Sequence, residues 1–285
     1  MEFYHANKDT MVFFIFALKR KMMFLRHNYT ATRLVFLFLS GMLLLFIVAP
    51  LLGLFFSTSL PALFETIKDT QVQGSIALTL GVSALFTLLA GLFALPLAYI
   101  MARKEFPGKA FIQGLIDIPI VLPHSAAGIA LLGFISRDSA LGRLADIMGL
   151  NLVGSPFAIG VAMAFVSVPF LINAARDGFE AVPQRLEQAA RSLGASPFRV
   201  FRQISLPLAK PSVITGLVLM FARGMSEFGA VVIVAYHPMT TPVLIFDRFN
   251  SFGLDYARSV AVLFIIICIL VFMALRLLGR KKSKL

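Results

Sequence analysis

The sequence predicts an all-α membrane protein with six transmembrane helices and both termini in the cytoplasm. Three observations lead to this prediction. Of the 285 residues, 59% are hydrophobic and only 14% are charged, whereas soluble domains carry about 25% charged residues. Several uncharged runs exceed the roughly 20 residues that a helix needs to cross a bilayer. The basic residues gather in alternate connections between these runs.

The apolar runs set the limits of the predicted spans. The longest of them, 70–102, holds 33 residues without a charge. Pro238 and Pro242 are expected to lead the chain out of the fifth span. No stretch between the runs is long enough to form a soluble domain, so we expect one membrane domain over residues 34–278 and a basic tail over 279–285. The predicted spans are 34–56, 73–101, 111–135, 156–175, 211–235 and 257–278.

Lysine and arginine predict the orientation, because they are retained on the cytoplasmic side of a membrane. Of the 26 such residues, 20 lie in the N-terminal segment, the second and fourth connections and the C-terminal end of the chain from Arg276 onward. The other three connections hold four. The net charge of +12 therefore follows from topology, and no soluble basic face that would bind nucleic acid is expected.

The N-terminal segment, 1–33, is expected to lie in the cytoplasm or at the membrane surface. Its apolar stretch 11–18 is too short to span a bilayer, and the cluster of basic residues, Lys19-Arg20-Lys21, follows it. A cleaved signal peptide has its basic region before the apolar one, so we expect an interfacial helix instead. A start at Met11, Met22 or Met23 is the alternative.

Residues that could carry chemistry are scarce. Cys268 has no partner for a disulfide and lies in an apolar run, so we interpret it as a packing residue. The four histidines (His5, His27, His124 and His237) are scattered, and each is expected to be structural. No metal-ligand cluster and no nucleophile motif is found. A phosphate-binding loop is also missing, since Gly108-Lys109 is followed by alanine rather than serine or threonine. We therefore do not expect an enzyme.

The longest predicted cytoplasmic loop, 176–210, contains a pattern typical of two short helices. Pro183 suits the first turn of a helix and Gly194 its left-handed C-terminal cap. Leu186, Ala189, Ala190 and Leu193 then form one apolar stripe. Ser196-Pro197 predicts the start of a second short helix, which carries Phe201 and is expected to end at Leu206-Pro207. An amphipathic loop lying on lipid headgroups is the alternative interpretation.

The spacing in this loop resembles the EAA loop of ABC-importer permeases. Gln188-Ala189-Ala190 is followed after three residues by Gly194, then after nine by Ile204, and then by Leu206-Pro207. Gln188 replaces the glutamate of the motif, although Glu187 precedes it. The resemblance implies that the loop docks on an ATPase subunit. The coupling residues that it implies are Glu187, Gln188, Ala189, Ala190, Gly194, Ala195, Pro197 and Phe201.

Two further stretches resemble the oxyanion branch of this family, the permeases for molybdate, tungstate and sulfate. They are 118–124, Ile-Pro-Ile-Val-Leu-Pro-His, and 223–230, Arg-Gly-Met-Ser-Glu-Phe-Gly-Ala; the stretch 236–249 looks most like the molybdate and tungstate members. The resemblance implies a homodimer with two ATP-binding subunits, which hold ATP and Mg²⁺, and an extracytoplasmic binding protein. It implies no cofactor in this chain and a multi-pass location in the cell membrane. The substrate is expected to be molybdate or tungstate, with sulfate or thiosulfate as the alternative.

Five residues inside the predicted spans are candidates for the anion pathway. Arg223 and Glu227 fall four residues apart in the fifth span, with Ser226 between them. They form either a structural ion pair or part of the pathway. Pro119 and Pro123 are expected to break the third span, and such breaks face protein or a water-filled cavity. This makes Pro123 and Ser125 candidates, because half-helix N-termini favour anions.

A secondary transporter is the rival from another class of protein. It would require inverted repeats and an ion-coupling site, and no repeat is found in the sequence.

Overall fold

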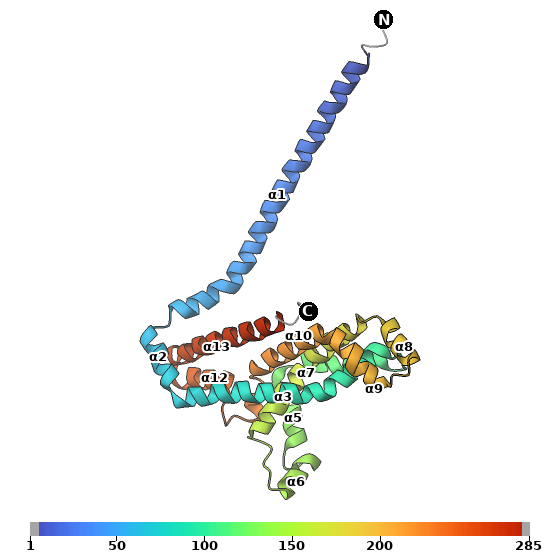
Figure 1. The fold of residues 1–285 in the computed structure, drawn as a ribbon. Helices are drawn as coiled ribbons and strands as arrows, with labels where there is room; N and C mark the ends of the chain where they lie inside the picture. Colours follow the sequence, from blue (N-terminus) through green and yellow to red (C-terminus); the bar gives the residue numbers. More distant parts are fainter. Residues whose placement is uncertain (1–5, 281–285) are drawn as a thin grey trace. The chain divides into compact units, whose positions relative to one another are not determined.

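The computed structural model describes the backbone of residues 6–280 and the side chains of residues 31–275. Its regular elements over the described residues are all helices, and the chain divides into two units between Ser57 and Thr58 (Figure 1). The helices of the second unit are α2 (Leu60–Lys68), α3 (Thr70–Arg103), α4 (Lys109–Val121), α5 (His124–Ile135), α6 (Ala140–Ile147), α7 (Pro156–Glu180), α8 (Gln184–Ser192), α9 (Pro197–Val200), η1 (Phe201–Ser205, a π-helix), α10 (Leu206–Met225), α11 (Val231–Val234), α12 (Thr241–Phe252) and α13 (Leu254–Arg280).

The first unit is a single helix, α1 (Ala6–Phe56), of 51 residues. Its apolar part, Ala31–Phe56, is long enough to cross a membrane. The helix runs without a break through the predicted boundary between residues 33 and 34. The interfacial helix stays a prediction. Residues 1–5, where the predicted N-terminal segment begins, and residues 281–285 of the predicted tail lie outside the described part.

The six predicted spans correspond to five long helices and one bent pair. Besides the apolar part of α1, the helices that can cross a membrane are Thr70–Arg103, Pro156–Glu180, Pro197–Met225 and Leu254–Leu275. The pair α4 and α5 provides a sixth crossing if it is counted as one span. Each predicted span therefore has a helical counterpart, although its ends differ by several residues.

The core of the second unit is built by α3, α7 and α10, which pack along one another (Figure 1). Small residues allow the close approach that drives helix association in lipid. At Gly178 of α7, an added Cβ would lie 2.4 Å from the Cβ of Ser212 in α10. A second apolar cluster joins α3, α5, α7 and α11.

The third predicted span is bent by 111° between α4 and α5. Pro119 was expected to contribute to the break, and this expectation is wrong. Pro119 lies inside the continuous helix α4, where it is buried. The break falls at Leu122 and Pro123, which both have extended ψ values (135° and 130°). Pro123 alone is enough to break the span, because a proline disfavours helical geometry in the residue before it, here Leu122.

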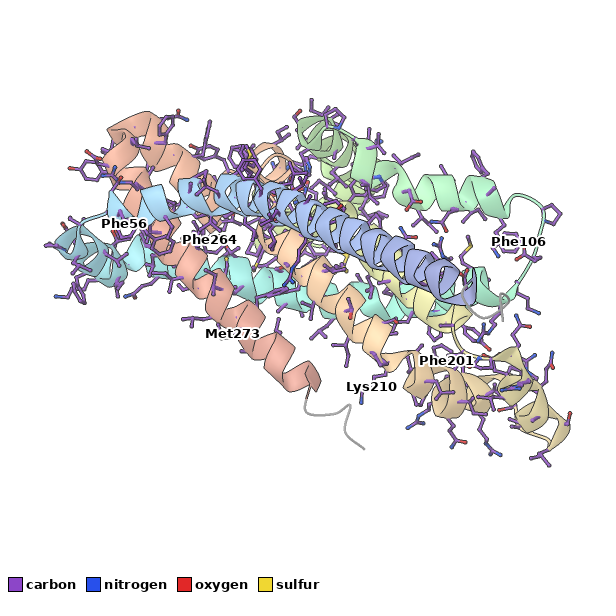
Figure 2. The ribbon with its side chains drawn as sticks, turned by 90° about the horizontal axis from the view of Figure 1, so that it is seen from above. Phe56, Phe106, Phe201, Lys210, Phe264 and Met273 are labelled. Carbon is purple, nitrogen blue, oxygen red and sulfur yellow. The ribbon has the colours of Figure 1, made fainter. Side chains whose placement is uncertain are left out.

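The second helix of the predicted coupling loop does not end at Leu206-Pro207. It continues from Pro197 through η1 into α10, so Phe201 and Lys210 lie on one helical stretch (Figure 2). Here Leu206 donates its amide to the Phe201 carbonyl, a π-type bond. The wide turn admits Pro207, which has no amide hydrogen to donate.

The fifth span ends earlier than predicted, at Met225 instead of 235. Ser226 caps this helix, and α11 begins only at Val231. The carboxylate of Glu227 accepts a hydrogen bond from the Ala230 amide, 2.8 Å away. Because a side chain satisfies this backbone group, the helix can end inside the protein.

Three short helices, α2, α6 and α12, lie in connections that the sequence analysis left unassigned. Pro242, interpreted as part of the way out of the fifth span, occupies the first turn of α12, where proline is tolerated. Arg248 of α12 binds Asp69, the N-cap of α3, at 2.7 Å. Burial opposes ionisation of Asp69, but hydrogen bonds from Arg248 and two backbone amides outweigh it and lower the pKa of this carboxyl.

Candidate functional site

The predicted coupling segment forms a helix, a glycine turn and a second helix. Gly194 follows α8 with φ +84°. Its amide donates to the Arg191 carbonyl at 2.9 Å, and the Ala195 amide donates to the Ala190 carbonyl at 3.0 Å. This pair of bonds is the Schellman motif, which requires a left-handed residue and therefore favours glycine. The predicted role of Gly194 as a C-terminal cap is confirmed.

A buried carboxylate fastens α8 to the helix bundle. The side chain of Glu187 is 3% exposed and that of Arg103, at the end of α3, is 7% exposed. Arg103 Nη2 lies 2.8 Å from Glu187 Oε1, and Arg103 Nε donates to the same oxygen at 2.9 Å. The hydroxyls of Ser205 and Tyr99 donate to the carboxylate at 2.8 Å and 3.1 Å. We call these four residues the Glu187 cluster.

The charge state of Glu187 follows from these contacts. Burial opposes ionisation, but the hydrogen bonds from Arg103 and Ser205 outweigh it, and the pKa of Glu187 lies below its ordinary value. Arg103 also donates to the Val182 carbonyl at 3.0 Å. The cluster is therefore a closed network, in which both charges are paired and both hydroxyls are used.

Three aromatic rings pack behind the Glu187 cluster. Tyr99 of α3, Phe179 of α7 and Phe201 of η1 contact one another with centroid distances of 5.0 to 5.8 Å. Such contacts add stabilisation beyond the area that they bury. Phe201, predicted as a coupling residue, thus belongs to the joint between α8 and the bundle.

The opposite side of the coupling segment is free over the described residues. Leu193 is 89% exposed and Phe198 is 71% exposed. These two were not among the predicted coupling residues. Of those that were, Ala190 and Ala195 are half-buried. Those that are exposed are Gln188, Ala189, Gly194 and Pro197. The segment therefore presents an apolar, small-residue tip to a partner and holds that tip through Glu187.

The second site lies where the bent third span meets the end of the fifth. Glu227 is buried, with its side chain 1% exposed, and its Oε2 lies 3.0 Å from Arg223 Nη2 and 2.8 Å from His124 Nδ1. Arg223 Nη2 is also 3.0 Å and 2.8 Å from the two ring nitrogens of His124. We call these three residues the Glu227 cluster.

The predicted pair of Arg223 and Glu227 forms, but not on one helix face. Arg223 belongs to the last turn of α10, and Glu227 lies beyond its end. The turn between the helices brings the carboxylate back toward the arginine, while its other oxygen binds the Ala230 amide. The carboxylate is therefore held by backbone and side chains together.

His124 is the partner that the sequence analysis missed. It was grouped with the scattered histidines, yet it is the first residue of α5, directly after the break. Gly229 lies against it so closely that an added Cβ would come within 2.6 Å of His124 Cβ. The position of the histidine after Pro123 was the available signal, since residues at a break in a span face protein or water.

The other predicted pathway residues border this cluster. Ser226 is exposed and lies 3.5 Å from Arg223 Nη1. Ser125 is exposed and follows His124 on α5. Pro123 is the N-cap of α5 and supplies no side-chain cap to the helix.

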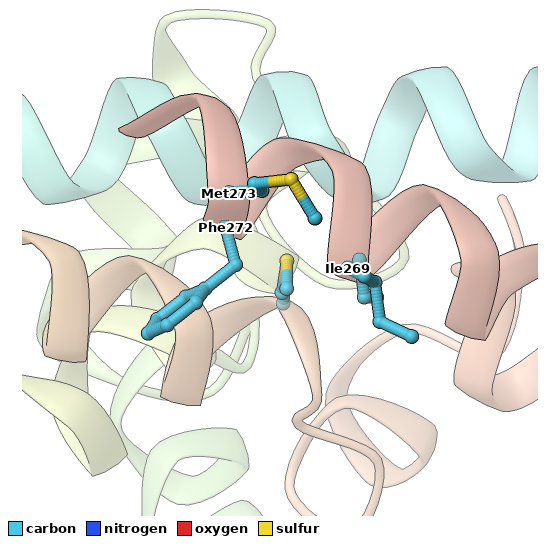
Figure 3. A pocket seen from close by; sticks show the side chains of 5 residues that line it. Ile269, Phe272 and Met273 are labelled. Carbon is cyan, nitrogen blue, oxygen red and sulfur yellow. The ribbon is translucent and has the colours of Figure 1, made fainter. Parts of the chain in front are cut away.

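An apolar pocket of about 500 Å³ lies between the end of α10 and α13. The side chains that line it are those of Met225, Cys268, Ile269, Phe272 and Met273 (Figure 3). Cys268 thus lines this pocket and is a free thiol. The pocket offers no charged group to an anion. Over the described residues no group of His, Cys, Asp and Glu could hold a metal ion.

Comparison with known proteins identifies the family. The family described as "Binding-protein-dependent transport system inner membrane component" matches residues 94–284. The chain belongs to this family. It is therefore a multi-pass membrane component of a transport system, and the predicted permease resemblance is confirmed.

Curated relatives extend over nearly the whole chain. A molybdate/tungstate transport system permease protein of Thermococcus kodakarensis is 42% identical over 262 residues, which is 91% of this chain and 100% of the relative. One from Pyrococcus furiosus is 44% identical over 86% of this chain and 94% of its own length. A probable sulfate transport system permease protein of Chlorokybus atmophyticus is 37% identical over 67% of this chain and 68% of its own length.

Solved structures agree on the fold. A bacterial ABC transporter for import of alginate has a chain with a TM-score of 0.66 at 16% identity, covering 86% of this chain and 96% of that one. An inward-facing methionine ABC transporter gives 0.55 at 17% identity, with 79% and 97% covered. The predicted all-α ABC importer permease fold is thereby confirmed, and this permease is a transport component, not an enzyme.

Proposed function

We propose that this permease is the transmembrane subunit of an ATP-driven importer for a tetrahedral oxyanion, molybdate or tungstate. One observation carries the proposal. Relatives named for molybdate and tungstate transport are 40–44% identical over 85–91% of the chain. The sulfate-named relatives match less of it, 67–81%.

The proposed transporter has partners at both faces of the membrane. The coupling segment belongs on the cytoplasmic side, where lysine and arginine are retained. There it docks on an ATPase subunit, which binds ATP and Mg²⁺. Two copies of the permease pair about a twofold axis and enclose the pathway, and each takes one ATPase. An extracytoplasmic binding protein delivers the anion at the opposite face.

The Glu187 cluster explains how movement passes from the ATPase to the spans. A displaced α8 pulls on Glu187, and Glu187 holds Arg103 of α3 and Ser205 of η1. Since η1 continues into α10, two of the three core helices receive the displacement directly. ATP binding and hydrolysis thereby alternate the access of the cavity between the two faces.

Sulfate is the second candidate substrate, because a sulfate-named relative is 37% identical to this chain. A competition assay distinguishes between the two candidate substrates. Uptake of radiolabelled tungstate into vesicles that contain the whole transporter is expected to be inhibited by molybdate at equimolar concentration and unaffected by a hundredfold excess of sulfate. Equal inhibition by sulfate would transfer the proposal to that anion.

The central experiment changes the turn of the coupling segment. An added Cβ at Gly194 meets no atom of this chain within 4 Å, so aspartate there acts through its backbone strain and its contact with a partner. A side chain at φ +84° costs about 1 kcal/mol, and overpacking a tight interface costs a further ~1–3 kcal/mol. We expect Gly194→Asp to insert normally but to bind the ATPase subunit at least tenfold more weakly, as measured by pull-down and by ATP hydrolysis in vesicles.

Gly149 provides a matched control. It follows α6 with φ +73°. Its amide donates to the Asp146 carbonyl at 2.9 Å, and the Leu150 amide donates to the Ala145 carbonyl at 2.9 Å. The motif is the same as at Gly194, and an added Cβ again meets nothing. Gly149→Asp should therefore retain the ATPase. Equal retention in both variants would contradict the coupling role.

A further inference from the structure

We propose that His124 and Arg223 contact the transported oxyanion where the third span breaks, with Glu227 holding both in place. This inference rests on the proposed function and specifies the site of anion contact within it. The cluster joins residues 99 positions apart in the sequence. It combines a guanidinium, an imidazole and a helix N-terminus, which are three groups that bind oxyanions.

Exposure distinguishes Arg223 and His124 from the carboxylate that holds them. Glu227 is 1% exposed, whereas the side chains of Arg223 and His124 are 27% and 41% exposed. The carboxylate therefore lies behind two partners that are themselves partly exposed. The pair of Glu187 and Arg103, which joins α8 to α3, differs in this respect, because both of its side chains are buried, at 3% and 7% exposed.

Arg223 keeps donors available for a ligand. Its Nη2 meets Glu227 and His124, while Nη1 meets only the Ser226 hydroxyl among the described residues, at 3.5 Å. A guanidinium carries five N–H donors in a planar fork that fits an oxyanion. Glu227 balances the charge of Arg223 when the site is empty, which keeps the cost of a cation within the membrane low.

The helix α5 adds backbone donors beside this fork. It has 12 residues and begins at His124, and its N-cap, Pro123, makes no side-chain hydrogen bond. The first amides of such a helix lack intrahelical partners and attract anions. Because α5 begins at His124, the imidazole ring and the free amides of the first helical turn lie close together.

The Glu227 cluster also lies where a movement of the helices could open or close the anion pathway. α5 follows a bend of 111°, and Gly229 packs against His124 at a distance that admits no side chain. Any displacement of the α10 end that carries Arg223 must move the cluster against α5. A change of access driven through η1 and α10 would therefore alter the anion contacts directly.

The test measures tungstate transported per ATP hydrolysed by the whole transporter in vesicles. His124→Gln leaves the Arg223–Glu227 pair in place and removes one ligand-facing group. Arg223→Lys keeps the charge and removes the fork. Loss of one charge-assisted hydrogen bond lowers affinity by about tenfold. We expect both variants to assemble with the ATPase, to melt within a few degrees of the wild type, and to carry about tenfold less tungstate per ATP.

His237→Gln is the control, because His237 is also exposed and lies outside the helices; its ratio should equal that of the wild type. Wild-type ratios in both His124→Gln and Arg223→Lys would overturn the inference, and so would a lower melting temperature combined with a wild-type ratio in the surviving transporters. If one variant does not assemble, the ratio of the other decides. A wild-type transporter that hydrolyses ATP but takes up no tungstate would instead refute the proposed function.

Discussion

Two buried carboxylates hold this permease together at separate places, and their surroundings differ. Glu187 binds the buried Arg103 at 2.8 Å and, more weakly, the half-exposed Arg191 at 3.5 Å, and the hydroxyls beside it are paired within the chain. Glu227 is as deeply buried, but its arginine and histidine partners remain partly exposed. The first network is closed, and the second is open on one side.

This difference suits the two networks to different roles, passing movement between helices and contacting the anion. A closed network passes displacement between helices, since each of its groups is committed to a neighbour in the chain. An open network holds a group ready for a ligand, because Arg223 retains N–H donors that no described residue uses closely. The same residue type, a buried glutamate bound to an arginine, thus serves a joint in one place and supports an anion contact in the other.

Removal of Glu187 is expected to have the largest effect on stability. Glu187→Ala leaves Arg103 buried and unpaired, and stranding one partner of a buried pair costs ~3–5 kcal/mol. We expect a strongly lowered melting temperature in detergent. Because the folded pKa of Glu187 is lowered, the stability that the wild-type carboxyl contributes is present above the ordinary pKa of 4.5 and is lost as the pH falls through the folded value. A Glu187→Ala variant as stable as the wild type at pH 7 would show that the network is not a joint.

Removal of Glu227 is expected to have a smaller effect. Glu227→Ala strands Arg223 and His124, but these are 27% and 41% exposed and can turn toward the anion pathway that we propose beside them. The cost should be ~1–3 kcal/mol, mostly from the unsatisfied Ala230 amide. Melting of the two alanine variants side by side checks the order. A larger loss in Glu227→Ala would reverse the distinction between the closed and the open network.

The sequence was sufficient for the long apolar helices and for the turn at Gly194. Hydrophobic length identifies spans because lipid requires it, and a left-handed cap favours glycine for local steric reasons. The same local reasoning failed at Leu206-Pro207 and at Met225. There a π-turn extends a helix through a proline, and a buried carboxylate lets another end early. Both depend on tertiary contacts that local patterns do not contain.

The sites divide in the same way. The spacing around Gly194 indicated the coupling segment, and the pair of Arg223 and Glu227 was visible four residues apart. The partners from distant helices were not visible in the sequence, because Arg103 lies 84 residues from Glu187 and His124 lies 99 residues from Arg223. Charged or polar residues at helix ends were the only signal for them.

One measurement tests the distinction between the two networks most directly. Transporters that contain Glu187→Gln or His124→Gln are purified through the permease, and both the bound ATPase and the tungstate carried per ATP are determined in the same vesicles. The account predicts that Glu187→Gln loses ATPase binding, because a weakened joint misplaces α8, whereas His124→Gln keeps the ATPase and loses tungstate transport. The same pattern in both variants, either loss of the ATPase or loss of transport with the ATPase retained, would contradict it.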